Sequence, residues 1–265
     1  MSGASWPSWP VQTWGDRSRP ALVLLHGFMG TARDWDAALP ALSPRFWCVA
    51  PELPGHGRRR LGGPLEMGAW AGALAATIRA QGLSRAHLMG YSMGGRLALR
   101  AAIEAPEVVD RLVLEGTSAG IEGSAERLAR AAQDDALAAL IRVEGLEVFL
   151  RRWYGAPLFE SLGREPGRLE AVIAARADQD PESMARIIAG MSPGRQRSEW
   201  DRLGGVRCPT LIVAGELDEK YRGLGARMVG LMGSARQAIV EGAGHNAHLE
   251  RPGAFVDRVV EFLES

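Results

Sequence analysis

The sequence has few cysteines, no excess of either charge and no long apolar run. Cys48 and Cys208 are its only cysteines, and neither has a second cysteine or a histidine at metal-binding spacing. We therefore expect no metal site and two buried free thiols; a disulfide between them is the less favoured alternative, because it requires an oxidising compartment. The 31 Lys and Arg residues balance the 31 Asp and Glu residues, which argues against nucleic acid or an anionic membrane as a partner.

Signals for membrane insertion and secretion are also missing. No apolar run approaches the roughly 20 residues that span a bilayer, and residues 1–16 lack the charged and apolar regions of a signal peptide. The sequence thus predicts a cytoplasmic protein that does not insert into a membrane, and it leaves the oligomeric state open. With 265 residues, of which 46% are hydrophobic, the chain can bury the core of one α/β domain.

The most informative stretch that is present reads LMGYSMGGR and covers residues 88–96. Ser92 lies there in a Gly-x-Ser-x-Gly setting, between a short apolar run and a helical run. A serine at a sharp strand-to-helix turn adopts strained backbone geometry, and glycines at positions 90 and 94 remove Cβ atoms that would clash. The pentapeptide alone would also fit a structural turn, so its meaning depends on the rest of the chain.

A candidate acid follows the serine in the sequence. Residues 210–215 form a β-branched and apolar run typical of a strand, and Asp218 comes just past its end. Active sites of open parallel sheets lie at that end of the strands. Glu216 and Glu219 are alternatives, but the spacing after the strand favours Asp218.

A candidate histidine comes last. The apolar run at 237–240 leads through a glycine-rich turn to His245. The order serine, acid, histidine is that of an α/β-hydrolase triad. We predict that Ser92, Asp218 and His245 are the catalytic residues.

A glycine-rich turn after the apolar run 21–25 is the expected place for an oxyanion hole. The backbone amides of Phe28 and Met93 would point two donors at one developing negative oxygen. We interpret His26, in the same turn, as a structural histidine that braces the turn by hydrogen bonding rather than as a proton-transfer group.

Apolar runs typical of strands alternate with amphipathic segments typical of helices. Strands are expected at 21–26, 46–51, 86–91, 111–115, 210–214 and 237–240, and helices near 32–42, 64–81, 94–105, 220–231 and 250–264. Such alternation predicts an α/β fold with a mostly parallel sheet and helices on both faces.

The pattern changes between residues 117 and 200, where helical runs dominate and no strand is convincing. Helices are expected there at 125–140, 146–153, 168–176 and 181–191. We interpret 117–200 as a helical cap inserted in a core formed by residues 1–116 and 201–265, closing over the catalytic residues.

Five motifs together resemble the MenH family, the 2-succinyl-6-hydroxy-2,4-cyclohexadiene-1-carboxylate (SHCHC) synthases of menaquinone and phylloquinone biosynthesis. They are LHGFMG at 25–30, PGHG at 54–57, GYSMGGR at 90–96, GELDEKY at 215–221 and GHNAHLERP at 244–252. The first two are shared by α/β-hydrolases at large, whereas the motifs around the serine and the histidine are narrower. Glu52 departs from the aspartate usual before LPGHG. The resemblance covers nearly the whole chain and implies the α/β-hydrolase fold.

The resemblance also implies an activity. In that family a hydrolase triad eliminates pyruvate from 2-succinyl-5-enolpyruvoyl-6-hydroxy-3-cyclohexene-1-carboxylate, without water and without a metal or organic cofactor. Ser92, made basic by His245 with Asp218 orienting the imidazole, would remove a ring proton. The alternatives are a carboxylesterase or carbon–carbon bond hydrolase, in which the serine attacks a carbonyl, and a ligand receptor or inactive relative on the same fold.

The substrate of that family is a polycarboxylate, and arginine grips planar carboxylates in pairs of hydrogen bonds. The resemblance assigns substrate binding to Arg96, one helical turn after the serine, to Arg130 and Arg176 in the predicted cap, and to Tyr91 and Trp153. For each arginine the alternative is a solvated helix face, and the run of arginines at 58–60 is more typical of a solvated loop.

Overall fold

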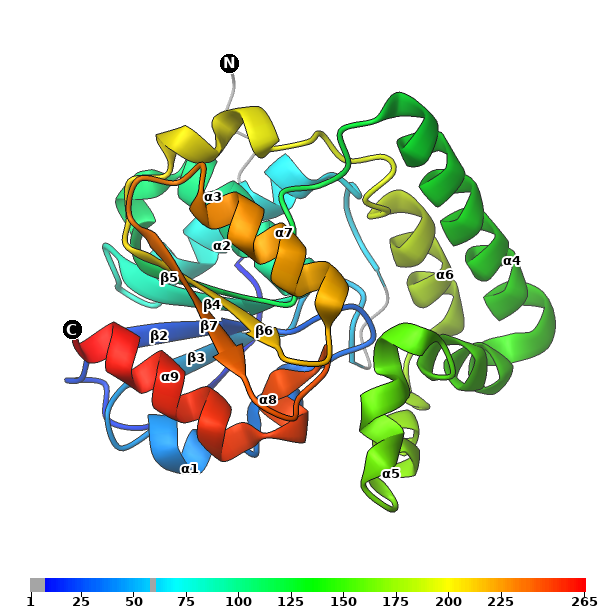
Figure 1. Cartoon of the computed structure of the whole chain (residues 1–265), viewed down its shortest axis with the longest axis horizontal. Coiled ribbons are helices and arrows are strands. Elements are labelled where there is room, and N and C mark those ends of the chain that lie inside the picture. Colours follow the sequence, from blue (N-terminus) through cyan, green and yellow to red (C-terminus); the bar gives the residue numbers. More distant parts are fainter. Residues whose placement is uncertain (1–7, 58–60) are drawn as a thin grey trace.

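The computed structural model describes residues 8–57 and 61–265, so the arginine run at 58–60 lies outside the described residues. One sheet with the strand order β1-β3-β2-β4-β5-β6-β7 forms the centre of the molecule (Figure 1). Only β1 is antiparallel to its neighbour among the described strands. The strands are β1 Val11–Trp14, β2 Ala21–Leu25, β3 Trp47–Pro51, β4 Ala86–Tyr91, β5 Val109–Glu115, β6 Thr210–Gly215 and β7 Ala235–Val240.

Helices cover both faces of the sheet, as the alternating pattern predicted. On one face lie α2 (Met67–Ala80), α3 (Met93–Glu104) and α7 (Glu219–Val229), and on the other α1 (Leu39–Leu42), α8 (Ala247–Glu250) and α9 (Pro252–Glu264) (Figure 1). Short 3-10 turns complete the fold: η1 Ala32–Trp35, η2 Pro106–Val108 and η4 Trp200–Gly205.

The central strands are mostly apolar because both of their faces are covered. Every residue of β2, β3, β4 and β6 is buried, which is the pattern of a parallel sheet between two helical layers. Leu88 and Leu97 belong to the core under α2 and α3, and Met89 and Phe255 to the core under α9. The carboxyl ends of the parallel strands, where the candidate site residues follow, are thus fixed from both sides.

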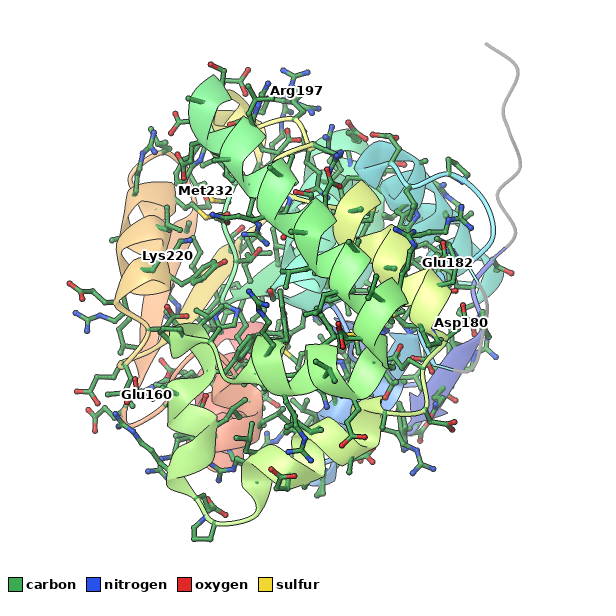
Figure 2. All side chains as sticks on the ribbon, turned by 90° about the vertical axis from the view of Figure 1, so that its right-hand side faces the viewer. Glu160, Asp180, Glu182, Arg197, Lys220 and Met232 are labelled. Carbon is green, nitrogen blue, oxygen red and sulfur yellow. The ribbon has the colours of Figure 1, made fainter. Side chains whose placement is uncertain are left out.

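A helical insertion joins β5 to β6 and stands apart from the sheet (Figure 1); Figure 2 shows it facing the viewer. It consists of α4 (Ser124–Tyr154), η3 (Pro157–Arg164), α5 (Arg168–Arg176) and α6 (Pro181–Gly190). The two helices expected at 125–140 and 146–153 are both present within α4, as two helical stretches separated by Gly145, whose φ of 85° and ψ of 172° are not helical. A left-handed residue interrupts the helical path there, and glycine adopts it without a Cβ clash.

One expected helix was wrong, and one strand was not expected. The segment 32–42 is η1 followed by the four-residue helix α1, because Pro40 has no amide hydrogen to continue a helix and occupies its first turn instead. The edge strand β1 was not expected, because its four residues VQTW are short and half polar. It forms by pairing with β3, from Val11 opposite Pro51 to Trp14 opposite Cys48.

Both cysteines are free thiols, as expected. Cys48 is buried in β3, and burial raises the pKa of its thiol to about 12. Cys208 is only partly buried, just before β6. Among the described residues, no helix combines the length and apolarity needed to cross a membrane, and no three or more His, Cys, Asp or Glu side chains are grouped so that they could hold a metal ion.

Candidate active site

Ser92 occupies the turn between β4 and α3 in a strained conformation, with φ 50° and ψ −107°. A Cβ on Gly94 would lie 2.2 Å from the carbonyl oxygen of Leu25, so no larger residue fits there. The Ser92 amide donates to the Glu115 carbonyl over 2.9 Å, and the Ser92 carbonyl accepts from the Thr117 hydroxyl over 2.8 Å. Contacts with β5 on both sides therefore hold the strained backbone, which aims the side chain out of the strand end.

Asp218 and His245 meet at the ends of β6 and β7. The Nδ1 atom of His245 lies 2.7 Å from Oδ2 of Asp218, and the residues are 2% and 6% exposed. Asp218 is also the N-cap of α7, where its Oδ1 accepts from the Tyr221 amide over 3.2 Å. The Asp218 carboxylate accepts the Nδ1 proton of His245, and this leaves Nε2 free to act as a base.

The loop that carries His245 is held by a buried carboxylate that the sequence analysis did not single out. Glu250 accepts from the amide of Gly244 over 2.8 Å and from that of Asn246 over 3.2 Å, so it holds the backbone on both sides of the histidine. The ring of Tyr221 lies 4.6 Å from the His245 ring, centroid to centroid. The imidazole is therefore fixed by its backbone, by Asp218 and by ring contacts.

A second buried acid–histidine pair lies behind the first. Glu115, at the end of β5, accepts from the amide of His248 over 3.0 Å and from its Nδ1 over 2.9 Å. The ring of Tyr91 lies between the two histidines, 5.3 Å from His245 and 4.8 Å from His248. No hydrogen bond joins the Ser92 hydroxyl to His245 within residues 8–57 and 61–265 of this structure, although catalytic hydrogen bonds often tighten only when substrate is bound.

The two candidate oxyanion amides come from the glycine-rich turn after β2 and from the start of α3. Met93 is the first residue of α3, so its amide has no acceptor within the helix. Phe28, in the turn after β2, lines the same cavity as Met93 and Ser92. His26 braces the turn, since its Nδ1 lies 2.8 Å from the Gly27 carbonyl and its Nε2 accepts from the Leu53 amide over 3.2 Å.

His26 is neutral in this position. Burial lowers its pKa to about 4, and its Nε2 is an acceptor, which a charged imidazole cannot be. Its 3.5 Å approach to Glu52 is therefore not an ion pair. These contacts match the bracing role expected from the sequence.

A cavity of about 50 Å³ adjoins the serine between the sheet and the helical insertion. Its wall is formed by Phe28, Ser92, Met93, Arg96, Arg130, Asp134, Trp153, Ile187, Ile188, Met191, Ser192 and Pro193. The rings of Phe28 and Trp153 meet edge to face, 5.5 Å apart. The cavity is therefore bounded both by the turns at the sheet and by the helical insertion.

The cavity brings two of the three predicted arginines together. Arg96 extends from α3, and Arg130 from α4 donates its Nε to Asp134 over 2.9 Å. Asp134 is 1% exposed. It was not predicted, although its place four residues after Arg130 on a helix was a usable signal. Burial first, and the charge of Arg130 second, lower the pKa of Arg96 to about 10.

Arg176 does not line this cavity. Its Nη2 donates to Oδ2 of Asp34 over 3.0 Å, in a buried pair whose side chains are 4% and 8% exposed. Its guanidinium also lies 5.6 Å from the centre of the Tyr154 ring. Its charge is thus balanced within the protein, unlike that of Arg96. The partner, Asp34, is 142 residues away in the sequence, and no local pattern pointed to it.

The family of the chain follows from comparison with known proteins. A family model described as "Alpha/beta hydrolase family" matches residues 22–258. The chain belongs to this family. The fold class predicted from the sequence is thereby confirmed, and the remaining comparisons narrow the resemblance within the family.

Similar proteins carry the names that the sequence motifs suggested. A protein of Bacillus subtilis (strain 168) is 35% identical over 257 residues, which cover 95% of this chain and 93% of that protein. A 2-succinyl-6-hydroxy-2,4-cyclohexadiene-1-carboxylate synthase of Citrobacter koseri is 33% identical over 252 residues, 94% of this chain and 96% of the relative. The solved structure of MenH from S. aureus is similar with a TM-score of 0.91 at 29% identity, over 96% of this chain and 97% of that one. The resemblance to MenH is confirmed.

Proposed function

We propose that this chain is an SHCHC synthase of menaquinone or phylloquinone biosynthesis. It would release pyruvate from 2-succinyl-5-enolpyruvoyl-6-hydroxy-3-cyclohexene-1-carboxylate and leave the conjugated ring product. The observation that carries the proposal is the pair of guanidinium groups, Arg96 and Arg130, in the wall of the same cavity as the strained Ser92. The named relatives support it over their full length. We place the enzyme in the cytoplasm, with a small polycarboxylate as its substrate.

In this scheme Ser92 is the base. Asp218 holds His245 with Nε2 free, His245 takes the hydroxyl proton of Ser92, and the serine oxygen takes a proton from the substrate ring. The electron pair of the broken C–H bond forms the new ring double bond, and the ring C–O bond breaks, so that the leaving group departs as the enolate of pyruvate. The proton held by His245 passes to the methylene carbon of this enolate, which gives pyruvate and returns His245 to its neutral form. Pyruvate and the ring product together contain all the atoms of the substrate, so no water and no cofactor enters the balance.

The amides of Phe28 and Met93 would stabilise the negative charge that develops as the ring proton leaves. Both residues line the cavity at Ser92, and within the described part of the chain neither amide donates to a backbone acceptor. Fixed donors in a site closed to water act more strongly on a developing charge than water does.

Carboxylates of the substrate would bind to Arg96 and Arg130. Arg130 is oriented by Asp134 through its Nε, which leaves its terminal nitrogens for a ligand. Tyr91 and Trp153 would contact the ring and its substituents. Arg176 would contribute only indirectly to substrate binding, because its guanidinium lies against the Tyr154 ring and is paired with Asp34. The helical insertion, within residues 117–200, would form the cap that closes over the substrate.

A hydrolase is the second candidate, because the same serine, histidine and amides would serve attack on a carbonyl. The two arginines distinguish the candidates, since an uncharged acyl substrate has no use for cations in a closed cavity. The test uses one set of proteins, wild type, Arg96→Ala and Arg130→Ala, in two reactions: pyruvate release from the enolpyruvoyl substrate and cleavage of p-nitrophenyl acetate.

We expect either arginine variant to lose about 100-fold in kcat/KM for pyruvate release, because a buried substrate carboxylate loses its partner. Arg96→Lys should recover only part of this loss, since lysine keeps the charge without the two-point grip. The loss in ester cleavage should be much smaller. Small and equal losses in both reactions, with folding verified by circular dichroism, would count against the synthase and favour the hydrolase.

A further inference from the structure

Two arginines on the same face of α3 have opposite electrostatic surroundings. Arg100 is paired with two carboxylates, Glu104 over 2.7 Å and Glu199 over 2.8 Å. Arg96, one helical turn earlier, donates its Nη1 only to neutral oxygens among the described residues, the Met191 carbonyl over 3.2 Å and Oε1 of Gln196. Both arginines face the segment that leads from α6 to η4. This segment supplies the carboxylate of Glu199 to Arg100, but only neutral oxygens to Arg96.

Gln196 is itself fixed in place. Its Nε2 donates to the Met191 carbonyl over 2.9 Å, so its Oε1 is the atom turned toward Arg96. The backbone nearby packs closely against α4, because a Cβ on Gly194 would lie 2.3 Å from the carbonyl oxygen of Arg127. The next residue, Arg197, points outward at the rim of the molecule (Figure 2) and pairs with Asp201 over 3.2 Å.

The charged groups nearest to Arg96 leave it uncompensated. They are Arg130, which repels it, and Asp134, which is already engaged by the Nε of Arg130. Two cations and one carboxylate therefore share the wall of the cavity at Ser92. The depressed pKa of Arg96 has the same origin, since burial and a like charge both disfavour the charged form.

We propose that Gln196 determines the specificity of the site for an anionic substrate: its neutral amide orients the guanidinium of Arg96 and leaves the charge free for a substrate carboxylate. This inference rests on the proposed function and names a residue through which the binding arginine acts. A glutamate has almost the same shape and would convert the surroundings of Arg96 into those of Arg100. The carboxylate of Gln196→Glu would then pair with Arg96 and compete with a carboxylate of the substrate.

The experiment compares Gln196→Glu with Gln196→Met, which removes the hydrogen bond at similar size but adds no charge. Arg197→Ala is the control for the segment, because that side chain points to solvent. We measure kcat and KM for pyruvate release, the rate of p-nitrophenyl acetate cleavage, and the Tm of each protein.

For Gln196→Glu we expect KM for the enolpyruvoyl substrate to rise at least tenfold, with a smaller change in kcat and in ester cleavage. Its Tm should rise, since a buried cation gains a partner. Gln196→Met should raise KM only a few-fold and should not raise Tm, and Arg197→Ala should match wild type. Equal effects of the Glu and Met variants would reduce Gln196 to a structural role, and an unchanged KM in Gln196→Glu would overturn the inference.

Failure of the proposed function is recognised separately. If wild type releases no pyruvate, the synthase assignment fails, and the role of Gln196 is then judged by binding of citrate, a tricarboxylate. The inference predicts that citrate raises the Tm of wild type and of Gln196→Met, and raises that of Gln196→Glu much less. A citrate response that is absent from wild type, or that is the same in wild type and Gln196→Glu, would contradict it.

Discussion

At the scale of single residues, the candidate site depends on a serine whose backbone is strained and on a histidine whose Nδ1 proton is held by an aspartate. The strain at Ser92 is held by Glu115 and Thr117, and the His245 tautomer by the 2.7 Å contact with Asp218. These side chains come from four different strand ends. In the proposed elimination Ser92 removes the ring proton, His245 accepts the proton of the serine, and Asp218 orients His245. Each of these steps requires the other two groups.

The first prediction follows from that dependence. Ser92→Ala, His245→Ala and Asp218→Asn should each lower kcat for pyruvate release by about 1,000-fold or more, because proton transfer through the pair requires all three groups. The Ser92→Ala/His245→Ala double variant should be scarcely slower than either single variant, since groups that act as one unit are not additive. Near-wild-type pyruvate release by folded Ser92→Ala protein would show that Ser92 is not the base.

The second prediction concerns His26, whose pKa falls from its ordinary 6.5 to about 4 in the folded protein because it is buried. Between those two pH values the unfolded chain binds a proton that the folded protein does not. The free energy of unfolding must therefore fall as the pH is lowered through this window. His26 alone should contribute a loss of about 2 kcal/mol between pH 6.5 and pH 5.

Urea unfolding of wild type and His26→Gln at these two pH values measures this loss. The glutamine can accept from the Leu53 amide but does not titrate, so the variant should be less stable at neutral pH and less sensitive to acid. Identical pH dependence in the two proteins would show that His26 is not the titrating group.

At the scale of elements, most of the fold could be predicted from hydrophobic pattern and glycine placement. The strands β2, β3, β4 and β6 are the mostly apolar, fully buried runs that a sheet covered on both faces requires. The strand β1 and the break at Pro40 were missed, because a short edge strand forms only through its partner and a proline overrides a helical period.

The site could be predicted where it is encoded by spacing and not where it depends on long-range pairing. Ser92, Asp218 and His245 each follow a strand, so their meeting follows from a parallel sheet. The pairing of Arg176 with Asp34 and the contact of Gln196 with Arg96 join segments that lie about 100 residues or more apart in the sequence. No periodic pattern marks such contacts.

The third prediction belongs to the turn between β4 and α3. In Gly94→Ala the new Cβ would lie 2.2 Å from the Leu25 carbonyl oxygen, so α3 must move away from β2. We expect the free energy of unfolding to fall by about 3 kcal/mol, together with most of the activity, because the Ser92 and Met93 groups move with the helix. Gly233→Ala is the control, since a Cβ there meets nothing within 4 Å, and it should change neither quantity. Similar effects of the two variants in urea unfolding would contradict this account of the turn.

At the scale of the whole molecule, a rigid sheet carries the proton-transfer groups and a separate helical insertion carries Arg130 and Trp153 (Figure 1). The cavity at Ser92, about 50 Å³, lies between them. The non-helical residue Gly145 marks one place where α4 departs from a regular helix. In the proposed function the sheet would transfer the proton and the insertion would hold the substrate.

The mass of the ring product of the wild-type reaction tests that central claim most directly. Purified protein is incubated with 2-succinyl-5-enolpyruvoyl-6-hydroxy-3-cyclohexene-1-carboxylate, and both products are quantified by mass spectrometry. Elimination predicts one pyruvate for each substrate and a ring product equal to the substrate minus pyruvate, with a new conjugated double bond. A ring product heavier by one water would show hydrolysis, and would contradict the assignment of Ser92 as the base of an elimination.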